Sequence, residues 1–255
     1  MTWIDSIILG VLEGLTEFLP ISSTGHLILA SKLLGLETTP FLTSFQIAIQ
    51  LGAIAAVVLL YWKSFLDVRF LTKLFVAFVP TGLVGFLVYP YVKGFLLGNS
   101  MVVVVSLFVG GVILILFELF HKEKPESLEG SKQITYRQAL MVGCFQSIAI
   151  IPGVSRSAAT IIGGLVVGMR RVAIVEFSFL LAVPTMLAAT GYDLLKSADT
   201  FAFDDVGLLM LGFMTAFVVA VISMRFLIGL VKRYTFIPFG IYRIVLAALF
   251  FFIIL

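Results

Sequence analysis

Long apolar segments run through most of this chain, and they restrict it to a fold that lies within a membrane. A helix needs roughly 20 apolar residues to cross a hydrocarbon core of about 30 Å. Six segments meet that length: 44–62, 72–92, 101–120, 175–195, 206–230 and 236–255. Because 61% of the 255 residues are hydrophobic and only 12% are charged, the sequence predicts an all-α polytopic membrane protein with six transmembrane helices.

Two further apolar segments, 6–34 and 138–168, are each interrupted near the middle by a polar turn. The first contains "PISSTG" from Pro20, and the second contains "PGVSRS" from Pro152. Each half has about 12 residues, or roughly 18 Å of helix, which is too short to cross a bilayer. Irregular backbone persists at membrane depth only where protein or a wet cavity satisfies it. Both segments are therefore predicted to be re-entrant helical hairpins.

The two halves of the chain resemble each other, which predicts an inverted-topology internal repeat within a single membrane domain, 1–255. A hairpin followed by three spans occupies 1–121 and recurs about 132 residues later in 135–255, with 122–134 as the linker. Three crossings in the first copy force the second copy upside down. The two broken turns then enter from opposite faces and meet near the midplane of the bilayer.

Basic residues predict the orientation of this fold, since cytoplasmic loops are enriched in Lys and Arg. With both termini outside, eleven basic residues fall in inner loops and three in outer loops. We therefore expect both termini on the outer side. The net charge of +3 is too small to indicate nucleic acid as a partner.

Two carboxylates, Glu13 and Glu17, lie in the first half of the first broken segment. They are one helical turn apart, so both project from the same face. Like charges this close repel, and they require a cation, a proton or a basic partner between them. The alternative is that both simply face water outside the membrane.

A hydroxyl cluster and an imidazole follow the same break. Ser22, Ser23 and Thr24 occupy the start of the next half-helix, where a serine or threonine cap and free backbone N–H groups favour anion binding. His26 comes three residues after Ser23, so the ring and the hydroxyl share a helix face. One hydroxyl is explained by capping alone, but three hydroxyls and a histidine indicate a chemical role.

The second broken turn contributes a guanidinium group, Arg156. Arginine keeps its charge and presents a fixed set of donors that suits phosphate. Three hydroxyl side chains accompany it at another helix start: Ser155, Ser157 and Thr160. The alternative is a structural ion pair between Arg156 and Glu13 or Glu17, which would also bring the two turns together.

Several other polar residues are interpreted as structural. Gln46 and Gln50, one turn apart on a predicted span, either line the cavity or form interhelical hydrogen bonds. Arg225 and Arg243 are each expected to reach the membrane surface by extending their long side chains.

The stretches "EGLTEFLPISSTGHL" and "PGVSRSAATI" are similar to the two signature regions of the undecaprenyl-pyrophosphate phosphatase family, the bacitracin-resistance type of bacterial membrane phosphatase. The resemblance extends over essentially the whole chain, including "FSFLLAVPTM" and "KRYTFIPFGIYR". It implies removal of the terminal phosphate from undecaprenyl diphosphate, a polyprenyl diphosphate lipid, which regenerates the monophosphate carrier for cell-wall precursors. It also implies a multi-pass protein of the bacterial plasma (inner) membrane, with both termini periplasmic and a pocket open to the outer face.

The same resemblance implies residue roles. The acidic pair corresponds to Glu13 and Glu17, the nucleophilic serine to Ser23, the histidine to His26 and the phosphate-binding arginine to Arg156. We expect His26 to take the proton from Ser23, or from a water molecule that attacks directly. The hydroxyls at the two helix starts are expected to add phosphate contacts: Ser22, Thr24, Ser155, Ser157 and Thr160.

A divalent cation and membrane lipids complete the expected partners. Carboxylate oxygens from Glu13 and Glu17 suit Mg²⁺ or Ca²⁺ better than zinc, which takes more His or Cys. The sequence is compatible with a homodimer but does not fix the oligomeric state. The alternative function is a secondary transporter or polyprenyl-phosphate flippase, because inverted repeats with broken helices are typical of transporters.

Overall fold

The computed structural model describes residues 1–37, 39–91, 99–123, 127, 130–196 and 205–254. Within these residues the fold is built of helices and contains no strand. The α-helices are α1 Trp3–Thr16, α2 Ser23–Leu33, α3 Pro40–Tyr61, α4 Val68–Tyr91, α5 Ser100–Phe120, α6 Tyr136–Ser147, α7 Arg156–Val166, α8 Arg171–Lys196, α9 Val206–Val231 and α10 Ile237–Ile254. Short 3-10 helices are η1 Trp62–Leu66, η3 Ser131–Gln133 and η4 Ile148–Ile150.

Five of the described helices, α3, α4, α5, α8 and α9, are long and apolar enough to cross a membrane. They coincide with five of the predicted spans and confirm an all-α polytopic membrane protein. The sixth predicted span, 236–255, contains α10, whose apolar part Ile237–Phe252 is shorter than these five. The predicted linker, 122–134, lies partly outside the described residues.

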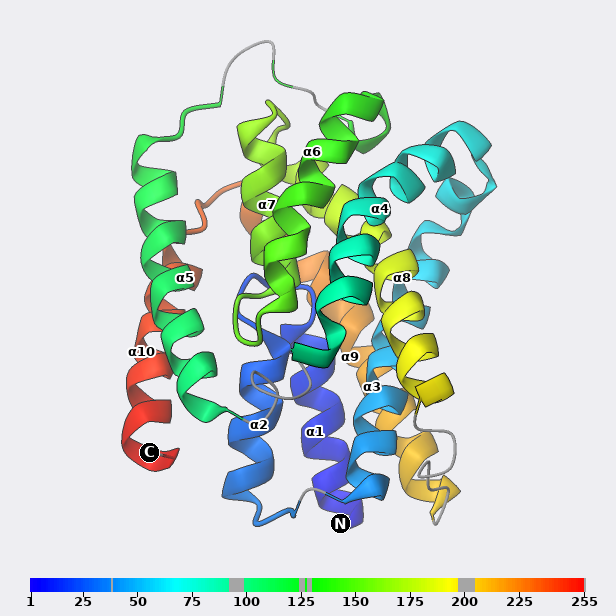
Figure 1. The fold of residues 1–255 in the computed structure, drawn as a ribbon, viewed down its shortest axis with the longest axis vertical. Helices are drawn as coiled ribbons and strands as arrows, with labels where there is room; N and C mark the ends of the chain where they lie inside the picture. Colours follow the sequence, from blue (N-terminus) through cyan, green and yellow to red (C-terminus); the bar gives the residue numbers. More distant parts are fainter. Residues whose placement is uncertain (38, 92–98, 124–126, 128–129, 197–204, 255) are drawn as a thin grey trace.

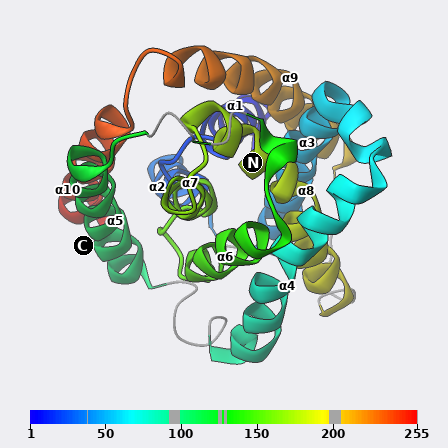
Figure 2. The same ribbon diagram turned by 90° about the horizontal axis from the view of Figure 1, so that it is seen from above.

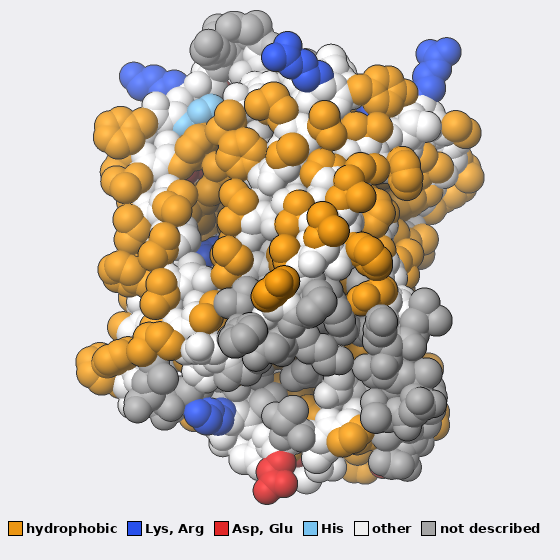
Figure 3. All heavy atoms as spheres, viewed as in Figure 1, with side chains coloured by type: hydrophobic (Ala, Val, Ile, Leu, Met, Phe, Trp, Pro, Cys, Tyr) orange, Lys and Arg blue, Asp and Glu red, His pale blue; other side chains and the backbone are white. Residues whose placement is uncertain are grey.

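The outer surface of the helices is largely hydrophobic. Figure 3 shows apolar side chains over the sides of the molecule, whereas most of the visible Lys and Arg side chains gather at its upper end. Large apolar residues are almost fully exposed, such as Phe120 at 84% and Phe252 at 83%. Such a surface is unfavourable in water and matches the hydrocarbon of a bilayer.

The two interrupted segments fold as helical hairpins, α1–α2 and α6–α7, which enter from opposite ends of the molecule (Figure 1). In the view from above they lie inside the surrounding helices (Figure 2). Their turns meet at the centre, where Ser157 Oγ donates a hydrogen bond to the Phe18 carbonyl at 2.7 Å. The α1 start and the α10 end lie at the same end of the molecule (Figure 1).

Each hairpin packs on a helix from the other half of the chain, α1 on α9 and α6 on α4. Glycines permit the close approach. A Cβ atom added to Gly14 would lie 2.7 Å from the Ala216 carbonyl oxygen, and one added to Gly143 would overlap the backbone of Ala77. Small residues at helix contacts are the usual means of close packing in membranes. The two halves of the chain are therefore interlocked.

The second helices of the two hairpins begin in the same way. Ser22 precedes α2 and Ser155 precedes α7, and both have positive φ angles, 70° and 75°. Each hydroxyl caps its helix by accepting a hydrogen bond from the backbone N–H three residues later, at 3.4 Å and 3.2 Å respectively. Positive φ is uncommon outside glycine and costs about 1–3 kcal/mol. Ser23 and Arg156 consequently occupy equivalent first positions in two helices of 11 residues each.

Candidate active site

A cavity of about 250 Å³ lies where the two turns meet. Six of the predicted site residues line it: Glu17, Ser22, Ser23, Thr24, Ser155 and Arg156. The cavity is also lined by Gln50 from α3 and by Met186 and Thr190 from the second half of α8. The cavity is thus bounded by both hairpins and by two of the long apolar helices.

Glu17 connects the hydroxyl of one hairpin to the guanidinium of the other. Its Oε2 accepts a hydrogen bond from Ser23 Oγ at 2.6 Å, and its Oε1 accepts one from Arg156 Nη2 at 2.8 Å. The Glu17 side chain is only 7% exposed and that of Arg156 is 12% exposed. Charge-assisted hydrogen bonds of this length are stronger than neutral ones. A hydroxyl bonded to a carboxylate has an acceptor ready for its proton.

Arg156 is held on both sides of its guanidinium. Besides Glu17, it donates through Nη1 to the Ser178 carbonyl at 2.8 Å and to the Ser178 hydroxyl at 3.3 Å. Its Nε is buried and has no hydrogen-bond partner. The ring of Phe18 lies 5.8 Å from the centre of the guanidinium. The arginine is therefore fixed at the wall of the cavity.

His26 bonds to other partners than the spacing predicts. Its Nδ1 lies 2.8 Å from the Ser22 carbonyl oxygen, and its Nε2 lies 2.7 Å from the Tyr242 hydroxyl. A carbonyl oxygen only accepts, so Nδ1 carries a proton and, in the neutral ring, Nε2 accepts from Tyr242. Both ring nitrogens therefore have partners other than Ser23, and the Ser23 hydroxyl donates to Glu17 instead.

Glu13 is completely buried and does not line the cavity, and neither of its carboxylate oxygens has a hydrogen-bond partner among the described residues. The charges of Glu17 and Arg156 act on it. A buried carboxylate without a partner is costly unless a proton or a cation compensates it. Two nearby carboxylates fit Mg²⁺ or Ca²⁺, which can complete their coordination with water and phosphate oxygens. No group of three His, Cys, Asp or Glu side chains that could hold a metal ion occurs in the described residues, so water and substrate oxygens would have to supply most of the coordination.

Ser157 and Thr160 lie behind the cavity wall. Ser157 donates to the first turn, as described above, and Thr160 Oγ1 lies 2.6 Å from the Ser178 hydroxyl. Neither residue lines the cavity. In this structure they support Arg156 and its partner Ser178, whereas Ser22, Thr24 and Ser155 face the cavity.

Arg243 of α10 lies buried between the two turns, a position that the sequence does not predict. Its expected extension to the membrane surface is wrong, because the side chain is 0% exposed. Its three nitrogens donate to five backbone carbonyls: those of Pro20 in the first turn, Gly153 and Val154 in the second, and Ser106 and Leu107 in α5. The guanidinium joins the two turns, and the adjacent Tyr242 meets His26. A charged residue near the middle of an apolar segment was the only available signal.

Comparison with known proteins identifies the family. The family model of bacitracin resistance protein BacA matches residues 6–249. This chain belongs to that family. The match covers both hairpins and the helices that enclose them, so it confirms the resemblance drawn from the two signature stretches.

Members of the family are similar to this chain over almost its full length. A protein of Persephonella marina is 52% identical, with 97% of each chain covered. Proteins of Aquifex aeolicus and Sulfurihydrogenibium sp. are 49% and 48% identical, with 96% and 98% of this chain covered and 96% and 99% of theirs. Each of these three relatives is named undecaprenyl-diphosphatase.

Proposed function

We propose that this chain is an undecaprenyl-diphosphatase of the bacterial plasma membrane. It hydrolyses the phosphoanhydride bond of the lipid diphosphate and leaves the monophosphate carrier used for cell-wall precursors. The observation that carries the proposal is the junction of Ser23, Glu17 and Arg156 from two hairpins at one cavity. Full-length similarity to proteins named for this activity supports it.

Arg156 binds the terminal phosphate in this proposal. Its guanidinium lies at the cavity wall beside the starts of α2 and α7, whose N–H groups also favour an anion. At an effective dielectric near 20, one charge pair at 4 Å is worth about 4 kcal/mol. Loss of this group is therefore expected to slow turnover by roughly 10²-fold or more.

Ser23 attacks the terminal phosphorus, and Glu17 accepts the hydroxyl proton across the 2.6 Å hydrogen bond. The bond from Ser23 Oγ to phosphorus forms as the phosphoanhydride bond breaks, and the lipid monophosphate leaves with the electron pair. Water then hydrolyses the phosphoserine, and inorganic phosphate leaves. In the alternative route water attacks directly, with Glu17 again accepting the proton.

His26 positions the first turn in this mechanism. It holds the Ser22 carbonyl through Nδ1, and it is itself held by Tyr242. Fixing Ser22 orients the next residue, Ser23, toward Glu17. This role replaces the direct proton transfer by His26 that the sequence spacing suggests, because both ring nitrogens have other partners.

A divalent cation, Mg²⁺ or Ca²⁺, held through Glu13 and Glu17 is part of the proposal. When bound, it supplies positive charge to the phosphoryl oxygens. The two Glu13 oxygens without partners support such a site. Removal of metal with a chelator is expected to abolish phosphate release, and Mg²⁺ or Ca²⁺ should restore it. Glu13→Gln should raise the metal concentration needed for half-maximal rate, and unchanged activity after chelation would contradict the cation.

The proposed membrane arrangement has six spans, with α10 as the sixth, and two re-entrant hairpins in inverted repeats. Both termini and the cavity opening face outside. The matched starts of α2 and α7 support the repeat, and most of the Lys and Arg side chains visible in Figure 3 lie at the end opposite the termini. Glu37→Cys and Lys122→Cys are each made in a Cys144→Ser background. In intact spheroplasts, an impermeant thiol reagent should label the cysteine at position 37 and not the one at position 122.

Phosphate release by the purified chain tests the function. The substrate is a C55 or shorter prenyl diphosphate in detergent. Arg156→Ala and Ser23→Ala are expected to lose activity, and trapped phosphoserine would demonstrate the covalent route. Ser31→Ala is the matched control, since Ser31 is a buried serine of the same helix as Ser23 whose hydroxyl has no partner. Full activity of Arg156→Ala would refute the proposed function, and full activity of Ser23→Ala would eliminate the serine route.

A further inference from the structure

A second hollow lies at the other end of α8 from the catalytic cavity. Its volume is about 430 Å³, and it is walled by the start of α8 and by the segment that joins α9 to α10. The catalytic cavity is lined by the second half of α8, about 15 residues further along, or roughly 22 Å of helix. The hollow is therefore separate from the site of phosphate release.

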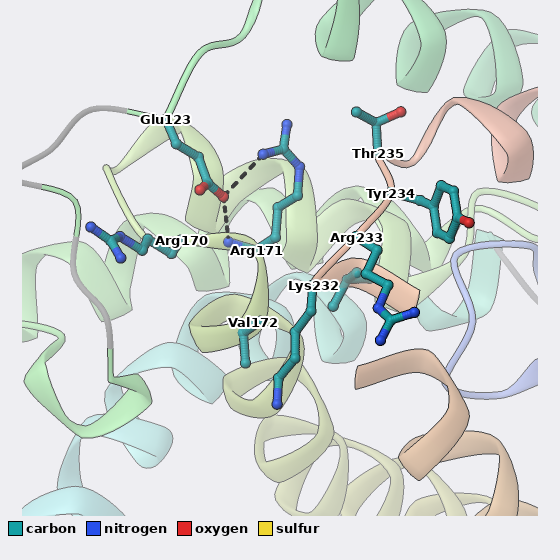
Figure 4. Close-up of a pocket in the computed structure, with 9 residues that line it drawn as sticks. Glu123, Arg170, Arg171, Val172, Lys232, Arg233, Tyr234 and Thr235 are labelled. Carbon is teal, nitrogen blue, oxygen red and sulfur yellow. Dashed lines mark hydrogen bonds and ion pairs between the residues drawn. The ribbon is translucent and has the colours of Figure 1, made fainter. Parts of the chain in front are cut away.

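Positive charge dominates this hollow. Four basic side chains line it, against one acidic side chain, Glu123: Arg170, Arg171, Lys232 and Arg233. Figure 4 shows Glu123 with Arg171 on one side and the run from Lys232 to Thr235 on the other. The basic residues come from two segments that are distant in sequence and are brought together by the packing of α8 and α9. Such convergence favours an anionic ligand.

Glu123 shows that one wall already binds an anionic group. Its Oε1 accepts a hydrogen bond from the backbone N–H of Arg171 at 2.8 Å and forms an ion pair with Nη1 of Arg171 at 3.1 Å. The guanidinium of Arg171 also pairs with the buried Glu118 at 2.6 Å. The charge of Arg171 is thus balanced by two carboxylates, and the surplus positive charge lies elsewhere in the hollow.

Lys232 and Arg233 on the opposite wall supply that surplus. Both are exposed, and neither forms an ion pair within the described part of the chain. The charge of Lys232 also acts on Glu176 of α8. Tyr234 and Thr235 add two hydroxyl groups to the same wall. This wall of the hollow therefore carries two positive charges, next to which Tyr234 and Thr235 also line the hollow.

The depth of the hollow identifies the source of the phosphate. The apolar part of α8 begins at Arg171 and that of α9 ends at Val231, so the hollow lies where two spans leave the hydrocarbon. Lipid headgroups occupy this level, and basic pockets between membrane helices at this depth bind anionic headgroups. Phe120, at the end of α5 and close in sequence to Glu123, is 84% exposed and offers apolar surface to an acyl chain.

We infer that this hollow binds the phosphate headgroup of an anionic membrane phospholipid, with Lys232 and Arg233 as its principal contacts. The inference does not depend on the proposed catalytic activity, because the residues belong to different parts of α8 and to a different cavity. The bound lipid would join the end of α9 to the start of α8 across the hollow.

Native mass spectrometry tests this inference. It measures the binding of dioctanoyl phosphatidylglycerol to the purified full chain in a neutral detergent. Each basic residue near an anionic headgroup contributes about 1 kcal/mol. The double variant Lys232→Ala/Arg233→Ala is therefore expected to bind roughly 30-fold more weakly. Affinity equal to that of the parent would overturn the inference. If the double variant does not purify, Arg233→Gln alone should weaken binding about fivefold.

Two controls separate a specific site from general attraction. Lys63→Ala/Arg69→Ala removes the same charge from exposed positions outside the hollow and should bind phosphatidylglycerol as the parent does. An equal loss in both double variants would overturn the site. Dioctanoyl phosphatidylcholine and inorganic phosphate should bind at least tenfold more weakly, and equal binding of phosphate would overturn the lipid as the ligand. Phosphate release by Lys232→Ala/Arg233→Ala reports that the variant is folded.

Discussion

Arg243 provides the most stringent test of how the two turns are held together. Its guanidinium donates to five backbone carbonyls. Lysine keeps the charge but has three donors, so Arg243→Lys leaves at least two of these carbonyls without a partner. Each unsatisfied buried group costs about 1–3 kcal/mol, which gives a loss of about 2–6 kcal/mol in the free energy of unfolding. Arg243→Met removes every donor and should be more damaging.

The loss should affect catalysis as well as stability. Arg243 bonds to the Pro20 carbonyl in the first turn and to the Gly153 carbonyl in the second, so its replacement is expected to shift Ser23 relative to Arg156. A misplacement of about 1 Å can cost 10²-fold in rate. We expect kcat for phosphate release to fall by about that factor in Arg243→Lys, with a smaller change in KM, because the loss concerns alignment of the reacting groups.

The assay combines thermal unfolding in detergent with phosphate release by the purified variant. Arg225→Met is the matched control, since Arg225 is an exposed arginine on the apolar helix α9, and it should leave the melting temperature and kcat unchanged. If Arg243→Met retains the melting temperature and the kcat of the parent within about twofold, the assignment of Arg243 as the residue that positions both turns is incorrect.

Three further perturbations test other parts of the structure. Tyr242→Phe removes the hydrogen bond to His26, which is worth about 1 kcal/mol, and should therefore lower kcat/KM about fivefold. Unchanged activity would contradict the role of His26 in positioning the first turn. Gly143→Ala should lower the thermal midpoint by overpacking α6 on α4, at a cost of about 1–3 kcal/mol, whereas Gly229→Ala, which has open space around it, should not. The Phe70 backbone N–H donates to Asp67 and holds the pKa of this carboxyl below its ordinary value. The stabilising effect of the carboxylate is therefore complete above the ordinary pKa and is lost as the pH falls through the lower folded pKa. Asp67→Ala should therefore weaken the dependence of the melting temperature on pH below about 4, and an unchanged profile would contradict this.

The apolar spans and the two hairpins could be predicted because hydrophobic length and turn residues act locally. The spans from α3 to α9 follow from their composition, and "PISSTG" and "PGVSRS" mark the interruptions. Cross-packing of each hairpin on the opposite half could not be predicted, because it depends on contacts such as that between Gly14 and the carbonyl of Ala216. A glycine in an apolar helix does not reveal which backbone approaches it.

The site could be predicted only in part. The residue types of the two turns are visible in the sequence, but their pairing is not, since helical spacing fails where the chain leaves the helix. Between Glu17 and Ser23 the backbone reverses, and the positive φ of Ser22 brings the Ser23 hydroxyl to Glu17. Arg243 was misassigned because its acceptors are main-chain carbonyls, which every residue has and which no sequence pattern identifies.

The packing of α1 on α9 has a consequence for biosynthesis. The helix on which α1 packs is among the last to leave the ribosome, and the guanidinium that pairs with Glu17 belongs to α7, so Glu17 enters the bilayer long before Arg156 exists. An acid without a partner is costly in hydrocarbon, and a chain that ends before α7 would leave Glu17 without its arginine. Truncation between α8 and α9 removes the helix on which α1 packs, so it should yield a first hairpin that added protease cleaves rather than half of a working enzyme.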